Sequence, residues 1–209
     1  DRVTYIQCDV SSYKSVEAAS HKVFQDVGVP TVLVNNAGIL GGRKFCDMDP
    51  EVIEKVVNVN LLGPMWTTRL FLPRMMENNH GHILNVVSLL GISGSTGVAE
   101  YCASKFGLSG FTEAMIQETK HTNVRVSAIY PGLISTALFT GVRYRFNLFP
   151  TLSPDYVAEK MVKILEAGKS AEVVIPTIAN LGRAMKLIPV GVQSVVKDVS
   201  GFFSCLFIG

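Results

Sequence analysis

Short apolar runs alternate along this chain with segments of helical periodicity, and this alternation constrains the fold more than any other feature. Residues 31–34, Thr-Val-Leu-Val, are followed by the polar turn Asn35-Asn36-Ala37-Gly38. A strand without polar alternation is typical of a parallel sheet, where both faces are buried. Alternation of such strands with helices predicts an α/β fold, a doubly wound parallel sheet with helices on both faces.

The positions of the elements follow from apolar periodicity and from helix-start signals. The expected strands cover residues 3–8, 31–34, 82–87, 124–129 and 172–175, and the expected helices cover residues 12–28, 50–79, 100–119 and 153–167. Ser11 or Ser12 is placed to cap the first helix, and Asp49 precedes Pro50 as the N-cap of the second. Gly63-Pro64 is expected to kink or distort that long helix just after Asn60.

Composition excludes several classes of function. The net charge is +2 without a block of like charges, so no nucleic-acid partner is expected. Four scattered cysteines predict neither a disulfide framework nor a zinc site, and no metal centre is expected. The hydrophobic content of 48% is high for a freely soluble domain, yet no apolar run reaches the length of a membrane-spanning helix.

One stretch carries the pattern of an acid–base site. Tyr101 and Lys105 are four residues apart on a predicted helix, and Ser88 ends the strand before it. Residues at this spacing lie on one helix face, which places a phenol beside an ammonium. A second pair at the same spacing, Tyr156 and Lys160, follows a helix-start signal with no serine-ended strand before it. We interpret the second pair as a surface feature, so the surroundings distinguish the two.

With these surroundings the chain resembles the short-chain dehydrogenase/reductase family. The matching motifs, in the family's order, are Cys8-Asp9-Val10, Asn35-Asn36-Ala37-Gly38, Asn60 within Val59-Asn60-Leu61-Leu62-Gly63, Ser88, Tyr101-x-x-x-Lys105, and Pro131-Gly132 followed by Thr136. Ser88 precedes Tyr101 by 13 residues (101 − 88), the family's usual interval. The resemblance implies a Rossmann-like fold, a nicotinamide cofactor (NAD or NADP), and hydride transfer to or from an alcohol or ketone.

The resemblance assigns catalytic roles to Asn60, Ser88, Tyr101 and Lys105. Tyr101 would donate or accept the proton, and the Lys105 cation is expected to lower the pKa of its phenol. Ser88 would hydrogen-bond the reacting oxygen. Asn60 would anchor a water of a proton relay, and its alternative role is that of a cap at the helix bend.

The cofactor-binding residues implied in the same way are Asp9, Val10, Asn36, Ala37, Gly38, Tyr101, Lys105, Pro131, Gly132 and Thr136. Asp9 and Val10 would contact the adenine, Lys105 the nicotinamide ribose, and Thr136 the carboxamide. The turn at residues 35–38 would lie along the cofactor, or it would serve only to stabilise the centre of the sheet.

One part of the family pattern is absent. The Gly-rich phosphate turn, which belongs to the first strand–helix unit, does not occur in these residues. Gly91-x-x-Gly94-x-x-Gly97 follows a later strand, and we interpret it as a flexible loop beside the substrate. We expect the sequence either to be a piece of a longer active protein, inactive by itself, or to be a short form that binds cofactor poorly.

Local stretches resemble a subgroup, the membrane-associated retinol dehydrogenases of the epidermal type and the related 17-beta-hydroxysteroid dehydrogenases. These stretches are residues 72–77, 79–83 and 104–107. The implied substrate is a small lipophilic alcohol or ketone, with all-trans-retinol/retinal first and steroids as the alternative. Two further hypotheses are a non-catalytic lipid-droplet or membrane scaffold and a soluble reductase of acyl-carrier substrates, which the apolar C-terminus disfavours.

Two segments bear on the substrate and on the membrane. Apolar residues of the loop at 133–150 would line a lipophilic pocket or pack as a lid on the core, namely Leu138, Phe139, Tyr144, Phe146, Leu148 and Phe149. We divide the chain into a catalytic domain, residues 1–177, and an apolar segment, residues 178–209. That segment would touch a cytosol-facing endoplasmic reticulum membrane or lipid droplet, or it would dock on the domain or on a partner subunit of a homodimer.

Overall fold

The computed structural model describes residues 3–139, 142–144, 150–200 and 205–207. A parallel sheet of four strands lies at its centre, in the order β1 (Val32–Asn35), β2 (Gly81–Val86), β3 (Val124–Pro131) and β5 (Glu172–Ile175). The register places Asn35 beside Asn85 and Val86 beside Ile129. The carboxyl ends of the strands therefore meet at one edge, as predicted.

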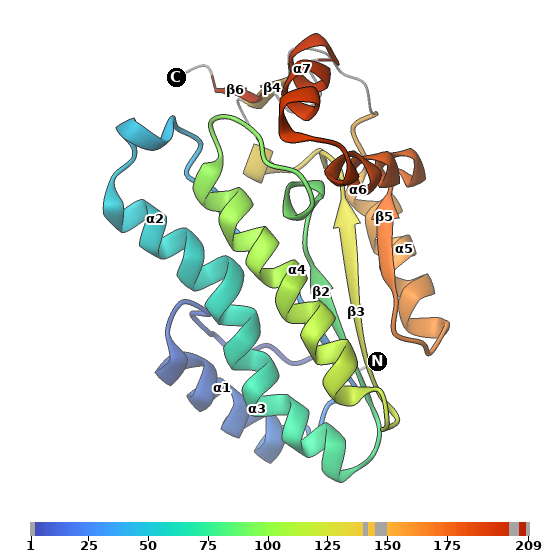
Figure 1. Ribbon diagram of the computed structural model, residues 1–209. Helices are drawn as coiled ribbons and strands as arrows, with labels where there is room; N and C mark the ends of the chain where they lie inside the picture. Colours follow the sequence, from blue (N-terminus) through green and yellow to red (C-terminus); the bar gives the residue numbers. More distant parts are fainter. Residues whose placement is uncertain (1–2, 140–141, 145–149, 201–204, 208–209) are drawn as a thin grey trace.

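Helices cover both faces of this sheet (Figure 1), which confirms the doubly wound α/β fold. They are α1 (Tyr13–Asp26), α2 (Pro50–Val57), α3 (Gly63–Glu77), α4 (Ala99–Thr119) and α5 (Pro154–Glu166). Ile83 of β2 packs with Met75 of α3, whereas its neighbour Leu84 packs with Val157 and Ile164 of α5. Successive strand residues point to opposite faces, so a strand buried on both sides must be apolar throughout.

The helix starts follow the predicted capping chemistry in part. The Ser12 side chain accepts a hydrogen bond from the Ser15 amide at 3.4 Å and caps α1, and the Ser153 side chain accepts one from the Tyr156 amide at 3.2 Å and caps α5. Asp49 is the N-cap residue of α2, but its side chain makes no capping hydrogen bond. Short polar side chains at these positions satisfy amides that have no partner within the helix.

The predicted long second helix is distorted just before Gly63-Pro64, as expected. A π-helical turn, Asn58–Leu62, joins α2 to α3. Proline has no amide hydrogen, so Pro64 cannot continue the regular bonding pattern, and a widened turn absorbs the mismatch. This distortion turns the Asn60 side chain inward, where it is fully buried.

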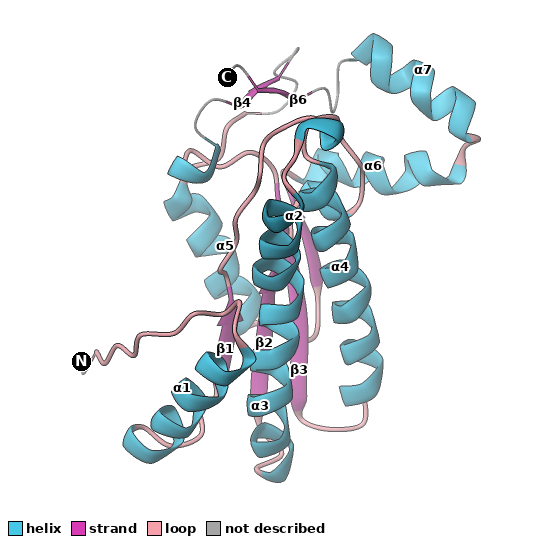
Figure 2. Cartoon of the chain, turned by 90° about the vertical axis from the view of Figure 1, so that its left-hand side faces the viewer, coloured by secondary structure: helices cyan, strands magenta, loops and turns pink. Residues whose placement is uncertain are grey.

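The predicted strand at residues 3–8 is wrong. These residues form no strand, and Figure 2 shows the N-terminal stretch running away from the sheet. Val3 and Tyr5 are 88% and 94% exposed. A strand is stabilised by hydrogen bonds to a neighbour, and among the described residues no strand lies beside this stretch.

The first residues of the segment after Pro176 pack against the predicted catalytic domain. It contains α6 (Leu181–Ala184), α7 (Val190–Ser200) and β6 (Cys205–Phe207), which pairs antiparallel with β4 (Val142–Tyr144). Ala179 is buried in the core, and the Arg183 guanidinium lies 4.8 Å from the Tyr130 ring centroid and 3.4 Å from the Glu172 carboxyl oxygen. Across the described ranges, no helix has the length and apolar character needed to cross a membrane.

Candidate active site

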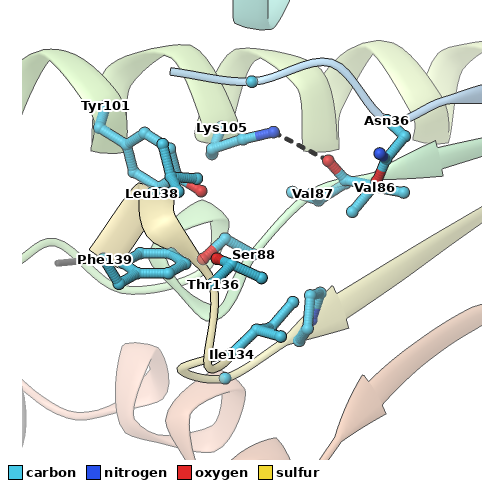
Figure 3. A pocket seen from close by; sticks show the side chains of 13 residues that line it. Asn36, Val86, Val87, Ser88, Tyr101, Lys105, Ile134, Thr136, Leu138 and Phe139 are labelled. Atoms are coloured by element: carbon cyan, nitrogen blue, oxygen red, sulfur yellow. Dashed lines mark hydrogen bonds between the residues drawn. The ribbon is translucent and has the colours of Figure 1, made fainter. Parts of the chain in front are cut away.

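A cavity of about 230 Å³ lies at the carboxyl ends of β2 and β3, beside the first turns of α4 (Figure 3). Parallel strands end together, so residues far apart in sequence converge at this edge. The cavity is lined by Asn36, Gly38, Val86, Val87, Ser88, Tyr101, Lys105, Pro131, Gly132, Ile134, Thr136, Leu138 and Phe139. The structure thus brings together most of the site residues predicted from the motifs.

Tyr101 lies in the first turn of α4 and is only 3% exposed. Burial raises the pKa of its phenol above the ordinary value, because a phenolate loses the solvation of water. A hydrogen bond with the Ser88 side chain opposes this rise. The prediction that Lys105 lowers the pKa of Tyr101 below its ordinary value is therefore wrong: the Lys105 ammonium lies 5.7 Å from the ring centroid, and the effect of burial on this pKa dominates.

Lys105 is also buried, and its ammonium donates a hydrogen bond to the Val86 carbonyl oxygen at 2.8 Å. Burial lowers the pKa of Lys105 from 10.5 to about 8, since the charged form is poorly solvated. An ammonium has three hydrogens to donate, and Val86 is the acceptor found among the described residues. Two donors of a buried cation are thus left at the cavity wall, which fits the hydroxyls of a ribose.

Ser88 begins a buried turn that includes Gly91, the first glycine of the predicted flexible loop. Its hydroxyl oxygen accepts a hydrogen bond from the Leu90 amide at 3.1 Å and caps a buried 3₁₀ turn, Leu89–Gly91. A Cβ on Gly91 would lie 2.5 Å from Val87 Cγ1 and 2.8 Å from the Lys105 carbonyl oxygen. Gly91 is therefore a packing residue that lets the turn approach α4, rather than part of a flexible loop.

Asn60 lies behind the cavity wall and is not among its lining residues. Its amide oxygen accepts from the Ile39 amide at 2.9 Å, and its amide nitrogen donates to the Ile39 carbonyl at 2.8 Å and to the Ser104 hydroxyl at 3.1 Å. Gly38 separates it from the site: a Cβ on Gly38 would lie 3.6 Å from the Asn60 amide oxygen and 3.7 Å from the Lys105 ammonium. In the structure, the side chain of Asn60 fixes the loop after β1.

Three predicted cofactor residues lie outside the cavity. Ala37 is exposed. Asp9 is exposed and accepts hydrogen bonds from the backbone and the hydroxyl of Ser11, and these bonds lower the pKa of its carboxyl group. Val10 packs against the π-helical junction, where a Cβ on Gly63 would lie 3.1 Å from its carbonyl oxygen.

The lining also contains residues that sequence reasoning missed. Val86 and Val87 come from the end of β2, and Ile134 follows the Pro131-Gly132 turn. The apolar run before Ser88 was the available signal for the two valines. Leu138 and Phe139 line the cavity as predicted, whereas Phe146, Leu148, Phe149 and the side chain of Tyr144 lie outside the described structure.

Comparison with known proteins agrees with this geometry. A family model described as short chain dehydrogenase matches residues 1–145. Retinol dehydrogenase 10-B of Danio rerio is 40% identical over 168 residues, which cover 78% of this chain and 50% of that protein. Epidermal retinol dehydrogenase 2 of Homo sapiens is 39% identical over 168 residues, or 78% of this chain and 54% of that protein. The chain spans about half the length of these relatives.

A solved structure shares the fold. A 4-hydroxyisoleucine dehydrogenase complexed with NADH superimposes with a TM-score of 0.73 at 27% sequence identity. The match covers 81% of this chain and 78% of the other.

Proposed function

This chain belongs to the short-chain dehydrogenase family, and from that premise we propose that it serves a nicotinamide-dependent oxidoreductase that interconverts a lipophilic alcohol and its carbonyl compound. The observation that carries the proposal is the meeting of Ser88, Tyr101 and Lys105 in one cavity. A hydroxyl, a phenol and an ammonium are the groups needed to hold an oxygen and move a proton to or from it. Residues 1–177 form the catalytic domain in this proposal.

Lys105 holds the cofactor through its two remaining donors, which suit the hydroxyls of the nicotinamide ribose. Asn36, Gly38, Pro131, Gly132 and Thr136 form the surrounding wall. Asp9, Val10 and Ala37 lie beyond the cavity, where they would meet the adenine end of a long ligand. When bound, the nicotinamide (NAD or NADP) supplies the hydride acceptor or donor.

Tyr101 moves the proton. Because burial raises its pKa, the phenol stays protonated and is ready to donate to a carbonyl oxygen. As this proton leaves, the Lys105 cation stabilises the developing phenolate. In the oxidative direction the phenol first loses its proton to solvent, and the resulting phenolate oxygen accepts the proton of the alcohol. Ser88 hydrogen-bonds the reacting oxygen and fixes its distance to Tyr101. Asn60 acts from behind by holding the loop that carries Gly38 against Lys105.

The substrate proposed first is all-trans-retinol or its aldehyde. Ile134, Leu138 and Phe139 are apolar residues of the cavity lining, and Figure 3 shows Phe139 near Ser88 and Thr136. The relatives at about 40% identity are named retinol dehydrogenases. A steroid alcohol is the second candidate, because the same lining suits a rigid apolar ring system. A scaffold without catalysis is disfavoured, since it would not require Tyr101 and Lys105 buried together.

The C-terminal segment is proposed to rest on a membrane or lipid-droplet surface that faces the cytosol. One side of this segment docks on the domain through Ala179 and Arg183. In the described part of this segment, large exposed apolar side chains include Ile178, Leu181, Leu187, Val190, Val192 and Val195. Burial of such exposed apolar side chains, either at a lipid interface or in a homodimer, is favourable because it removes apolar surface from water.

Turnover of defined alcohols tests the function. The full-length protein is incubated with NAD⁺ or NADP⁺ and with all-trans-retinol, a 17-beta-hydroxysteroid or a short water-soluble alcohol, and the carbonyl products are separated by chromatography. We expect retinal to form fastest, and Tyr101→Phe to lower kcat by at least 10²-fold while cofactor binding persists. Tyr156→Phe is the matched control, because Tyr156 belongs to the other Tyr-x-x-x-Lys pair, on α5. Turnover by Tyr101→Phe near that of the control would refute the assignment.

A further inference from the structure

Glu100, which directly precedes Tyr101, is a buried acid that the proposed chemistry does not use. Its side chain is 2% exposed. One carboxyl oxygen accepts a hydrogen bond from the Gly41 amide at 2.9 Å, and the other has no partner among the described residues. Burial of an incompletely paired carboxyl group costs free energy, so its position calls for a compensating role.

The bond from Glu100 ends a series of three anchors on the loop that follows β1. Both backbone groups of Ile39 bond to the Asn60 side chain. Leu40 packs against the cluster that contains Tyr101 and Cys102. Gly41 is pressed so closely onto its surroundings that a Cβ there would lie 2.9 Å from Val52 Cγ1 and 3.1 Å from the Glu100 carboxyl oxygen. Three successive residues are therefore fixed, each by a different kind of contact.

Helix α4 connects these anchors to the reacting groups. Glu100 and Ser104 are four residues apart and form one row on the helix, next to the row of Tyr101 and Lys105. Glu100 accepts a hydrogen bond directly from Gly41 of the loop, whereas Ser104 accepts one from Asn60, whose side chain in turn holds Ile39. The second row lines the cavity. A shift of the loop would thus change the environment of Tyr101 and Lys105 together.

We propose that Glu100 is a positioning residue, which ties the loop at residues 38–41 to the first turn of α4 and so holds Tyr101 and Lys105 in line for proton transfer. The inference rests on the proposed function for its catalytic consequence. The tether itself is the bond between the Glu100 oxygen and the Gly41 amide. This hydrogen bond requires one acceptor oxygen near the Gly41 amide and does not require the second carboxyl oxygen.

Two substitutions separate the acceptor from the rest of the side chain. Glu100→Gln keeps an oxygen on the Gly41 amide and places the amide nitrogen where the unpartnered oxygen lies. Glu100→Ala removes the acceptor and leaves the Gly41 amide unpaired. Glu113→Gln is the matched control, because Glu113 is exposed on the same helix. Each variant is measured for hydrogen exchange of peptides that cover residues 36–46, and for kcat and KM with all-trans-retinol and the cofactor that the unaltered protein uses.

We expect Glu100→Ala to speed exchange in residues 36–46 and to lower kcat about 10- to 100-fold, with KM for the alcohol changed less than threefold. Glu100→Gln and the control should match the unaltered protein in both measurements. Slow exchange in Glu100→Ala would overturn the tether, and fast exchange with unchanged kcat would overturn the positioning role. If the unaltered protein oxidises no alcohol, the proposed function fails, and the exchange measurement still decides whether Glu100 holds the loop.

Discussion

Lys105 offers a quantitative test of the site, because its burial should appear in the pH dependence of stability. Its pKa falls from 10.5 to about 8 on folding. A shift of this size makes the charged form about 3 kcal/mol less favourable in the folded protein than in the unfolded chain. Below pH 8 this destabilisation is fully present. It disappears as the pH rises from about 8 to 10.5, because the unfolded chain binds more protons over that range.

The perturbation is Lys105→Met, a substitution that removes the charge and leaves an unbranched apolar side chain slightly shorter than that of lysine. Loss of the bond to the Val86 carbonyl changes the stability of this variant by an amount that does not depend on pH. The free energy of unfolding is measured by urea denaturation at pH 7 and at pH 10. We expect the unaltered protein to gain about 2–3 kcal/mol relative to Lys105→Met between these two values.

Lys160→Met is the control, because Lys160 has the same spacing from a tyrosine but lies partly exposed on α5. It should behave like the unaltered protein, which shows that the effect does not follow from the loss of any lysine. Parallel pH dependences for Lys105→Met and the unaltered protein, within about 1 kcal/mol, would show that Lys105 is well solvated. The electrostatic account of the cavity would then be wrong.

Two further predictions concern packing and the C-terminal segment. Gly91→Ala should lower the free energy of unfolding by about 1–3 kcal/mol and reduce turnover, because its Cβ would meet Val87 and the Lys105 carbonyl oxygen. In the same urea denaturation assay the control Gly110→Ala, on the open side of α4, should raise the free energy of unfolding by up to about 1 kcal/mol. Flotation with liposomes should recover the intact protein but less of a variant truncated after residue 177, and equal recovery would contradict membrane contact by residues 178–209.

Local sequence patterns were sufficient for most of the fold. The unbroken apolar strands indicated a parallel sheet, and Ser12 and Ser153 marked helix starts that the structure confirms. The spacing of Tyr101 and Lys105, after a strand that ends at Ser88, predicted three residues that share one cavity. These features depend on backbone periodicity and on capping within a few residues, so they can be recognised in the sequence.

Tertiary packing determined the features that local sequence patterns do not predict. Residues 3–8 have the composition of a strand, but a strand also needs a neighbour. The glycine spacing predicts a flexible loop at Gly91, but the backbone of Lys105 lies directly against this residue. The direction of the Tyr101 pKa shift, and the contact of Glu100 with Gly41, follow from burial and from a loop 59 residues away in sequence. The sequence by itself therefore determined which groups are present, and the tertiary structure determined their solvation and their distances, on which the chemistry depends.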